Sequence, residues 1–434
     1  MLPFLTRLAR LAIHTIYRFE VGGAGVPPTG PLIIVSNHGN HIADPAAVLI
    51  VARRPIRFLG KAPFFENPLT RWFVRGAGAI PVYRRKDDPS RVDRNEETFR
   101  IVKDELAKGA AIGIYPEGMS HNEPAILPLR TGTARIALGA ARLTDAPIRI
   151  VPIGVFYRHK TRFRSPGMAM VGTPIPWDDL RGRAEDDADA VRELTARIEE
   201  GLRQATVSLE TWEDAQAVDV AESVYAAEFE LEKDPEQRHE RFRQVAGALA
   251  RLRSKDPDRI EPILESVLRF SKVLGDLRLR PEDLHLAPRP RTVWKWIARR
   301  SIFFLLATPV VVVGLILFYL PYLATAWIER LLRLSPEVRV TYKIFGGGVI
   351  FILWIALLST LIGLDSRALF GVIAALVLPL FALATLVLVE RWREAFLEAR
   401  TYLVLRQRSS LRDRLLERRR AIARELEGLR KELR

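Results

Sequence analysis

The chain of 434 residues contains no cysteine. Disulfides, thiolate nucleophiles and thiolate metal ligands are therefore excluded, so any chemistry has to come from other side chains. Histidine is also scarce, with seven in the whole chain. Outside one stretch discussed below, no pair of them has the spacing and neighbouring carboxylates of a metal site. The sequence therefore predicts no metal.

Negative charge is in the minority. Asp and Glu number 51 against 66 Lys and Arg, which gives a formal net charge of +15. Such a balance predicts an anionic partner, either nucleic acid or an anionic membrane. Three apolar segments favour the membrane and argue against nucleic acid, because about 20 apolar residues cross a core of ~30 Å as a helix. These segments are Ile302–Leu323, Ile344–Leu364 and Leu369–Val389.

A histidine and a carboxylate stand close together directly after the apolar run Leu32–Val35. A neutral imidazole can take a proton from a hydroxyl, and a carboxylate on its other nitrogen fixes the tautomer and stabilises the imidazolium. Spacing does not choose the base, since Asp44 follows His38 by six positions and His41 by three. Asn37 and His38 alone also fit a plain strand-to-helix turn, in which such residues satisfy backbone groups.

Three further blocks follow in order. The run Gly78–Tyr83 ends at the cations Arg84, Arg85 and Lys86, which are natural partners for a phosphate. A second carboxylate, Glu117, stands in a Pro-Glu-Gly turn at the end of another apolar run. Beyond Arg130 comes the apolar segment Ile148–Val155, which contains a proline.

Together, these four blocks resemble the phospholipid/glycerol acyltransferase family, whose members carry Asn-His-(four or five residues)-Asp, Gly-to-Arg, Pro-Glu-Gly and proline-containing apolar blocks. The resemblance covers about residues 30–175. The residues within the motifs are most similar to those of the glycerol-3-phosphate acyltransferases of fungi and many bacteria. Five residues separate His38 from Asp44, where four are commonest, which keeps His41 as an alternative base. Because Asn37 before His38 matches the family's Asn-His, we assign His38.

The resemblance implies that His38 activates a glycerol hydroxyl, that Asp44 orients the imidazole, and that no cofactor or covalent acyl-enzyme is needed. The donor would be acyl-CoA or an acyl carrier protein. The residues expected to bind substrate are Arg84, Arg85 and Arg130 for the phosphate, Glu117 and Gly118 for the acceptor's glycerol, and Lys61, which is either a phosphate contact or a solvated charge.

The sequence does not distinguish three acceptors: glycerol 3-phosphate, its 1-acyl derivative and another lysophospholipid. The residues of the motifs favour glycerol 3-phosphate. A lysophospholipid remodelling enzyme is one alternative. A non-catalytic membrane-binding protein on the same fold is another, although the intact His38, Asp44, Arg84 and Glu117 argue against it.

The order of elements predicts an α/β fold. Strands expected at about 78–83, 110–115 and 148–155 alternate with helical patterns at 93–107 and 131–143, which implies a mostly parallel sheet with flanking helices. Ligands in such sheets gather at the carboxyl ends of strands. His38, Arg84 and Glu117 each follow the end of a strand, so the fold and the motifs indicate one pocket.

Composition divides the rest of the chain. We expect an amphipathic interfacial helix at 1–19, a catalytic domain at 20–180, a helical appendage at 181–290, a membrane region at 291–390 and a basic helical tail at 391–434. The tail has fourteen Lys and Arg against seven Asp and Glu, which suits anionic headgroups.

Charge also predicts the membrane topology. Three full crossings would put the two ends of the chain on opposite sides, yet both ends of the membrane region and its first connection are rich in Lys and Arg, which favour the cytoplasmic side. We therefore predict that Ile302–Leu323 is re-entrant or interfacial, broken by Pro309 and Pro321, and that 344–389 forms a hairpin. The catalytic domain would face the cytoplasm at the inner membrane.

Overall fold

A computed structural model describes residues 2–68, 70–84, 88–158, 160–206, 209–231, 234–277, 279–285, 290–334, 336–365, 367–407 and 409–432 of the chain. The chain divides into two compact units. The first, here called the sheet unit, comprises Met1–Ala215, Lys233–Gly247 and Pro336–Val340. The second, the helical unit, comprises Gln216–Glu232, Ala248–Ser335 and Thr341–Arg434.

The sheet unit is built on seven strands in the order β1-β7-β6-β2-β5-β3-β4. All neighbours pair in parallel except β6 and β7, which are antiparallel, so the expected mostly parallel sheet is confirmed. The strands are β1 (Tyr17–Gly23), β2 (Leu32–Ser36), β3 (Arg57–Lys61), β4 (Ile80–Val82), β5 (Ala111–Ile114), β6 (Arg149–Tyr157) and β7 (Ser165–Val171).

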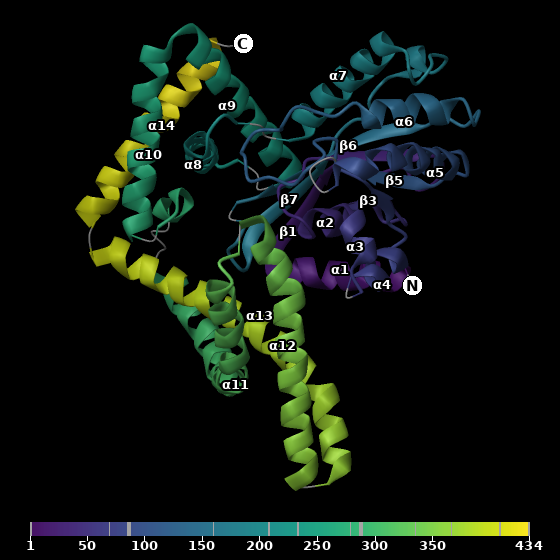
Figure 1. The fold of residues 1–434 in the computed structure, drawn as a ribbon. Coiled ribbons are helices and arrows are strands. Elements are labelled where there is room, and N and C mark those ends of the chain that lie inside the picture. Colours follow the sequence, from purple (N-terminus) through teal and green to yellow (C-terminus); the bar gives the residue numbers. More distant parts are fainter. Residues whose placement is uncertain are drawn as a thin grey trace. The chain divides into compact units, whose positions relative to one another are not determined.

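Helices cover both faces of this sheet (Figure 1). One face carries α5 (Asn95–Ala107), α6 (Gly132–Ala141) and α7 (Ala188–Ala205), and the other carries α1 (Leu2–Ile16) and α2 (Ala43–Ala52). The central strand β2 is buried along its whole length, because it is covered from both sides. Its alternate residues Ile33 and Val35 enter the core with Val102 and Leu106 of α5 and with Leu138 of α6.

Three strands were not expected from the sequence. The helix predicted to reach residue 19 ends at Ile16, and Tyr17–Gly23 pairs with β7 instead. β3 and β7 were likewise not predicted. β1 pairs with β7 far along the chain, and β3 pairs with β4 and β5, so tertiary pairing overrides the local pattern in these strands. β7 lies between β1 and the preceding β6. Short helices α3 (Ala62–Glu66) and α4 (Arg71–Gly76) follow β3, and 3₁₀ turns lie at Pro89–Arg94, Asp178–Leu180 and Pro281–His285.

Beyond the sheet the chain is helical, as expected. The helices are α8 (Trp212–Glu228), α9 (Pro235–Lys255), α10 (Pro257–Leu277) and, at the far end, α14 (Ser409–Glu432). We expected the appendage to begin at 181, whereas α7 belongs to the sheet unit and contributes Leu194 and Ile198 to its core. In the helical unit, Arg419 of α14 is fully buried and its guanidinium donates to Glu228 of α8 at 2.7 Å.

Three long helices complete the helical unit: α11 (Pro290–Leu331), α12 (Pro336–Asp365) and α13 (Ala368–Gln407). Their segments Ser301–Leu331, Thr341–Asp365 and Ala368–Leu397 are long and apolar enough to cross a membrane. The expected break at Pro309 and Pro321 is wrong, since α11 continues through both residues. Proline is tolerated inside apolar helices where neighbouring groups satisfy the backbone carbonyls that it leaves free.

Candidate active site

Four strands bring the predicted site residues to one edge of the sheet. β2, β5, β3 and β4 are neighbours and parallel, so their carboxyl ends lie together. His38 follows β2, Glu117 follows β5, Lys61 ends β3 and Arg84 follows β4. With neighbouring strands ~4.8 Å apart, this edge extends for about 14 Å from the histidine to the arginine. This edge therefore presents a histidine, a carboxylate and two cations in that order.

The structure pairs His38 with Asp44. His38 Nδ1 lies 3.0 Å from Asp44 Oδ2, which also accepts the Asn40 N–H at 2.7 Å. Asp44 is buried in the first turn of α2, where the helix dipole favours a negative charge. Because a carboxylate only accepts hydrogen bonds, the imidazole proton belongs on Nδ1, and Nε2 is left as the basic nitrogen.

The second candidate base has different surroundings. His41 Nε2 lies 3.4 Å from the ammonium of Lys61, and its ring centroid lies 6.0 Å from that of His38. Lys61 also lies over the ring of Phe64, 5.9 Å from its centroid. The geometry therefore places the orienting carboxylate on His38, and it brings Lys61 within the same cluster of side chains.

Sequence reasoning missed Tyr115, which stacks on the catalytic candidate. The rings of His38 and Tyr115 lie 4.0 Å apart and 17° from parallel, and Phe58 stacks on the far side of Tyr115 at 6.1 Å. Burial, with a smaller contribution from the charge of Asp44, raises the pKa of the Tyr115 phenol, which therefore stays neutral. The only signal was its position directly before the Pro-Glu-Gly turn.

Glu117 is almost completely buried. Its Oε1 accepts the His38 N–H at 2.9 Å, and its Oε2 accepts the Leu127 N–H at 2.8 Å and contacts the ring Nε2 of His121. The next residue, Gly118, has φ +73°, a conformation that glycine adopts without strain. The turn thus directs the Glu117 carboxylate into the protein interior, where it contacts the loop that carries His38.

Asn37 ties the same loop to the sheet. Its Nδ2 donates to the Val155 carbonyl at 2.9 Å, and its Oδ1 accepts the Val155 N–H at 2.8 Å. The amide thus caps both backbone groups of one residue in β6. The simple reading of this asparagine, as a residue that satisfies backbone groups in a turn, agrees with these two contacts.

The remaining predicted cations are less closely placed. Arg84 is partly buried just beyond β4, at the far end of the site edge. Arg130 is exposed and lies beside Gly118, where an added Cβ would come within 3.3 Å of its Cγ. Arg85 lies outside the described residues. Among those that are described, no three His, Asp or Glu side chains are grouped to hold a metal.

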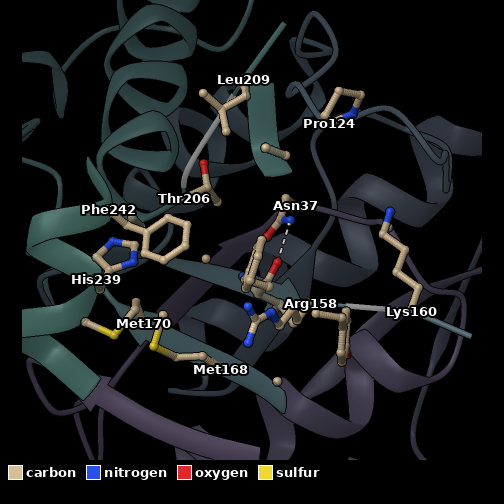
Figure 2. A pocket seen from close by; sticks show the side chains of 18 of the residues that line it. Asn37, Pro124, Arg158, Lys160, Met168, Met170, Thr206, Leu209, His239 and Phe242 are labelled. Atoms are coloured by element: carbon tan, nitrogen blue, oxygen red, sulfur yellow. Dashed lines mark hydrogen bonds between the residues drawn. The ribbon is translucent and has the colours of Figure 1, made fainter. Parts of the chain in front are cut away.

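A pocket lies beside Asn37 and Asp44, along β6 and β7 (Figure 2). Its lining is mostly apolar, and Figure 2 shows Met168, Met170 and Phe242 grouped at one part of it. The lining also includes Arg158 and Lys160, from the loop after β6, and the buried His239 of α9. Burial lowers the pKa of His239 and keeps this imidazole neutral.

Comparison with known proteins agrees with these blocks. The family model described as Acyltransferase matches residues 18–155. Over 134 residues the chain is 33% identical to glycerol-3-phosphate O-acyltransferase 2 of Saccharomyces cerevisiae, a match covering 30% of this chain and 18% of the yeast protein. Over 156 residues it is 30% identical to lyso-ornithine lipid O-acyltransferase of Pseudomonas aeruginosa, covering 36% of this chain and 54% of that protein.

Two further comparisons cover more of the chain. Over 202 residues it is 28% identical to 1-acyl-sn-glycerol-3-phosphate acyltransferase alpha of Mus musculus, covering 43% of this chain and 66% of the mouse protein. A crystal structure of the 1-acyl-sn-glycerophosphate acyltransferase of Thermotoga maritima aligns with a TM-score of 0.36 and 14% identity, over 47% of this chain and 78% of the other. The chain spans less than a fifth of the length of the yeast relative.

Proposed function

We propose, from the match of residues 18–155 to the acyltransferase family model, that the protein moves a fatty acyl group from a thioester donor to a hydroxyl of glycerol 3-phosphate or of 1-acylglycerol 3-phosphate. One observation carries the proposal. The His38 imidazole, oriented by Asp44 at 3.0 Å, shares its sheet edge with the cations Lys61 and Arg84. A base and a phosphate-binding group are thus presented together.

The geometry supports direct transfer. His38 Nε2 removes the proton of the acceptor hydroxyl as its oxygen attacks the thioester carbonyl, and Asp44 stabilises the imidazolium that forms. Collapse of the tetrahedral intermediate breaks the carbon–sulfur bond, and the imidazolium returns its proton to the departing thiolate. The base is thereby restored, and no covalent acyl-enzyme forms. The donor is acyl-CoA or an acyl carrier protein, both acidic and both suited to a basic protein.

Binding of the acceptor follows the sheet edge. With its hydroxyl at His38, a glycerol phosphate points its phosphate along this edge toward the side of Lys61 and Arg84. Arginine suits a phosphate because its planar fork donates two parallel hydrogen bonds. Arg85 and Arg130 are the additional phosphate contacts that the family resemblance implies.

The pocket of Figure 2 supports a place for the acyl chain. It begins beside Asn37 and Asp44 and continues along an apolar lining that includes Met168 and Phe242. Unbranched methionines adapt to irregular apolar surfaces, which suits a flexible chain. We assign this pocket to the acyl group of the donor.

The membrane is the proposed site of action. Three apolar helices anchor the chain, and the acceptor and product are lipids or lipid precursors. Since Lys and Arg flanking apolar helices favour the cytoplasmic side, the sheet unit lies on the cytoplasmic side of the inner membrane.

The similarity to a lyso-ornithine lipid acyltransferase supports a second acceptor class, a lysolipid without a glycerol phosphate. An acyltransfer assay on purified membranes distinguishes the classes. Each acceptor is offered with radiolabelled acyl-CoA or acyl carrier protein, and the labelled product is identified. We expect transfer to glycerol 3-phosphate or its 1-acyl derivative. Transfer only to lysolipids other than 1-acylglycerol 3-phosphate would favour remodelling, and no transfer to any acceptor would favour a non-catalytic role.

A further inference from the structure

The carboxylate of Glu117 is fully engaged by the chain itself. Three donors converge on its two oxygens: the N–H groups of His38 and Leu127 and the ring of His121. We propose that Glu117 and His121 are positioning residues that hold His38 in place, and that Glu117 does not bind the acceptor. The proposal rests on the acyl transfer proposed above and departs from the role that the family resemblance implies for Glu117.

The loop carrying both residues holds His38 from two sides. Glu117 Oε1 accepts the His38 N–H at 2.9 Å, and the His121 N–H donates to the His38 carbonyl at 3.0 Å. Both backbone groups of the base are therefore fixed by residues 117–121.

The ring of His121 completes the arrangement. Its Nδ1 accepts the Glu123 N–H at 3.2 Å, which places the ring proton on Nε2, facing Glu117 Oε2. A neutral imidazole with this tautomer donates to the carboxylate and needs no charge to do so. His121 thereby orients Glu117, as Asp44 orients His38.

Burial makes the acceptor role costly. The Glu117 side chain has no exposed surface and His121 only 9%. A glycerol hydroxyl would have to displace the Leu127 N–H or the His121 ring, and a displaced buried donor loses its partner. A small shift of His38 would be equally damaging, because a misplacement of about 1 Å costs roughly 100-fold in rate.

Glu117→Gln tests the proposal. The glutamine has one acceptor oxygen, so its NH₂ group would face an N–H donor and the hold on His38 would loosen. We expect kcat to fall about 10- to 100-fold while the acceptor KM stays within about twofold. The matched control is Glu97→Gln, the same change at an exposed position of α5 away from the site, with wild-type kinetics expected. A raised acceptor KM with unchanged kcat would overturn the proposal.

His121 gives a second arm. We expect His121→Leu to lose about tenfold in kcat and His121→Gln, which restores a donor toward Glu117, to recover most of it. Equal loss in both variants would count against orientation by hydrogen bonding. Hydrogen exchange of the amides in residues 36–44 is independent of activity: it should speed up in Glu117→Gln and stay unchanged in Glu97→Gln. Unchanged exchange in both variants would overturn the proposal even if no acyl transfer were found.

A different observation concerns the membrane topology. α12 and α13 form an antiparallel hairpin whose tip follows Asp365, where Figure 1 shows the two helices side by side. Gly363 and Gly371 meet near the tip, since a Cβ added at Gly371 would lie 3.0 Å from Gly363 Cα. The open end of the hairpin holds Lys343 and Trp392.

Both ends of α11 contact that open end. Lys343 Nζ lies 3.4 Å from a Glu329 carboxylate oxygen near the end of α11. The ring of Phe304, near its start, lies 5.8 Å from that of Trp392. Between them, Phe318 lies near rings on both arms of the hairpin.

A third crossing helix would have one end at the tip of the hairpin, and α11 has neither end there. We infer that α12 and α13 cross the membrane and that α11 enters and leaves on one side, lying across the open end. Contacts of the flanking helices agree, because α10 before α11 packs on α14 after α13, with Arg259 paired to Glu432 at 2.8 Å. Both ends of α11 are thus on the same side of the membrane, as the charge pattern predicted, although α11 lacks the expected break.

Cysteine labelling tests this membrane topology, because the native chain has no cysteine to interfere. Single cysteines are introduced at Ser335, Ser366 and Ser410, and intact cells are treated with an impermeant maleimide. We expect Ser366→Cys alone to react, with all three reacting in permeabilised cells as the control. Reaction at Ser335→Cys and Ser410→Cys instead would mean three crossings. No reaction at any position in intact cells would mean that the hairpin does not cross. Either result would overturn the inference.

Discussion

The sheet unit and the helical unit position their important residues by different means. Around His38, the carboxylates of Asp44 and Glu117 accept hydrogen bonds from its ring and its N–H, and the His121 N–H donates to its carbonyl, which fixes this side chain and its backbone. The apolar helices of the helical unit instead meet through small residues, as where a Cβ added at Gly314 would fall within 2.1 Å of Thr385 Oγ1. Proton transfer needs atoms placed to within a fraction of an ångström, whereas an anchor needs only close contact in a medium that gives no hydrophobic drive between helices.

This difference predicts which substitutions damage chemistry and which damage assembly. Changes in the sheet unit should alter rate constants in a protein that still folds. Changes in the apolar helices should alter the amount of folded protein and leave the specific rate almost unchanged.

The largest effect is expected at the catalytic pair. His38→Ala should lower kcat by 10²- to 10⁴-fold, the range of a lost general base, and Asp44→Asn should approach it because the tautomer is no longer fixed. His41→Ala is the matched comparison and should retain most activity. Steady-state acyl transfer in membranes with equal enzyme content measures all three. An inactive His41→Ala beside an active His38→Ala would reverse the assignment of the base.

A smaller effect is expected from Arg84→Ala. Loss of a phosphate contact removes binding that is present in ground and transition states alike, so the acceptor KM should rise about 10- to 100-fold while the donor KM is unchanged. Arg100→Ala, at an exposed position of α5, controls for a lost surface arginine. If both variants show the same acceptor KM, Arg84 does not bind the phosphate.

The contrast with the membrane anchor is tested at Gly371. A Cβ there would lie 2.8 Å from the Ser359 carbonyl oxygen, so Gly371→Val should cost about 1–3 kcal/mol of stability through overpacking. We expect less folded protein after detergent extraction and a lower Tm, with kcat per folded enzyme within about twofold. Gly348→Val is the control, since a Cβ at Gly348 meets nothing within 4 Å. A lowered specific rate with normal stability would contradict the division of roles.

The smallest effect is expected in the pocket of Figure 2. Met170→Trp adds bulk to its lining and should shift donor preference toward shorter acyl chains by a few fold in kcat/KM, since each methylene buried is worth about 0.8 kcal/mol. Leu143→Trp, at an exposed position after α6, is the control. A chain-length profile measured with a donor series checks the shift. Identical profiles would remove the acyl chain from this pocket.

The sequence could predict features that depend on neighbouring residues, but not contacts between residues far apart in the chain. His38, Asp44 and the Pro-Glu-Gly turn stand in short blocks at strand ends, so their place at one sheet edge followed from the alternation of strands and helices. The contact of Asn37 with Val155 joins positions 118 residues apart. The stacking of Tyr115 depends on a side-chain orientation. Neither contact can be inferred from a local sequence pattern.

The helical unit shows the same limit more strongly. Composition identified its apolar segments, because length and hydropathy are properties of one segment. It did not predict that α11 stays continuous through Pro309, since whether a proline breaks an apolar helix depends on the neighbours that satisfy the freed carbonyl. The strand Tyr17–Gly23 was missed for a similar reason, because its partner β7 is distant in sequence.

The ion pair between the buried Arg419 and Glu228 also constrains the order of biosynthesis. The two residues are 191 positions apart, so at 5–20 residues per second a ribosome releases the glutamate about 10–40 s before the arginine. The hairpin of α12 and α13 is synthesised within this interval. The packing around Glu228 therefore stays incomplete until α14 has been made, and Arg419 completes it around a carboxylate synthesised much earlier.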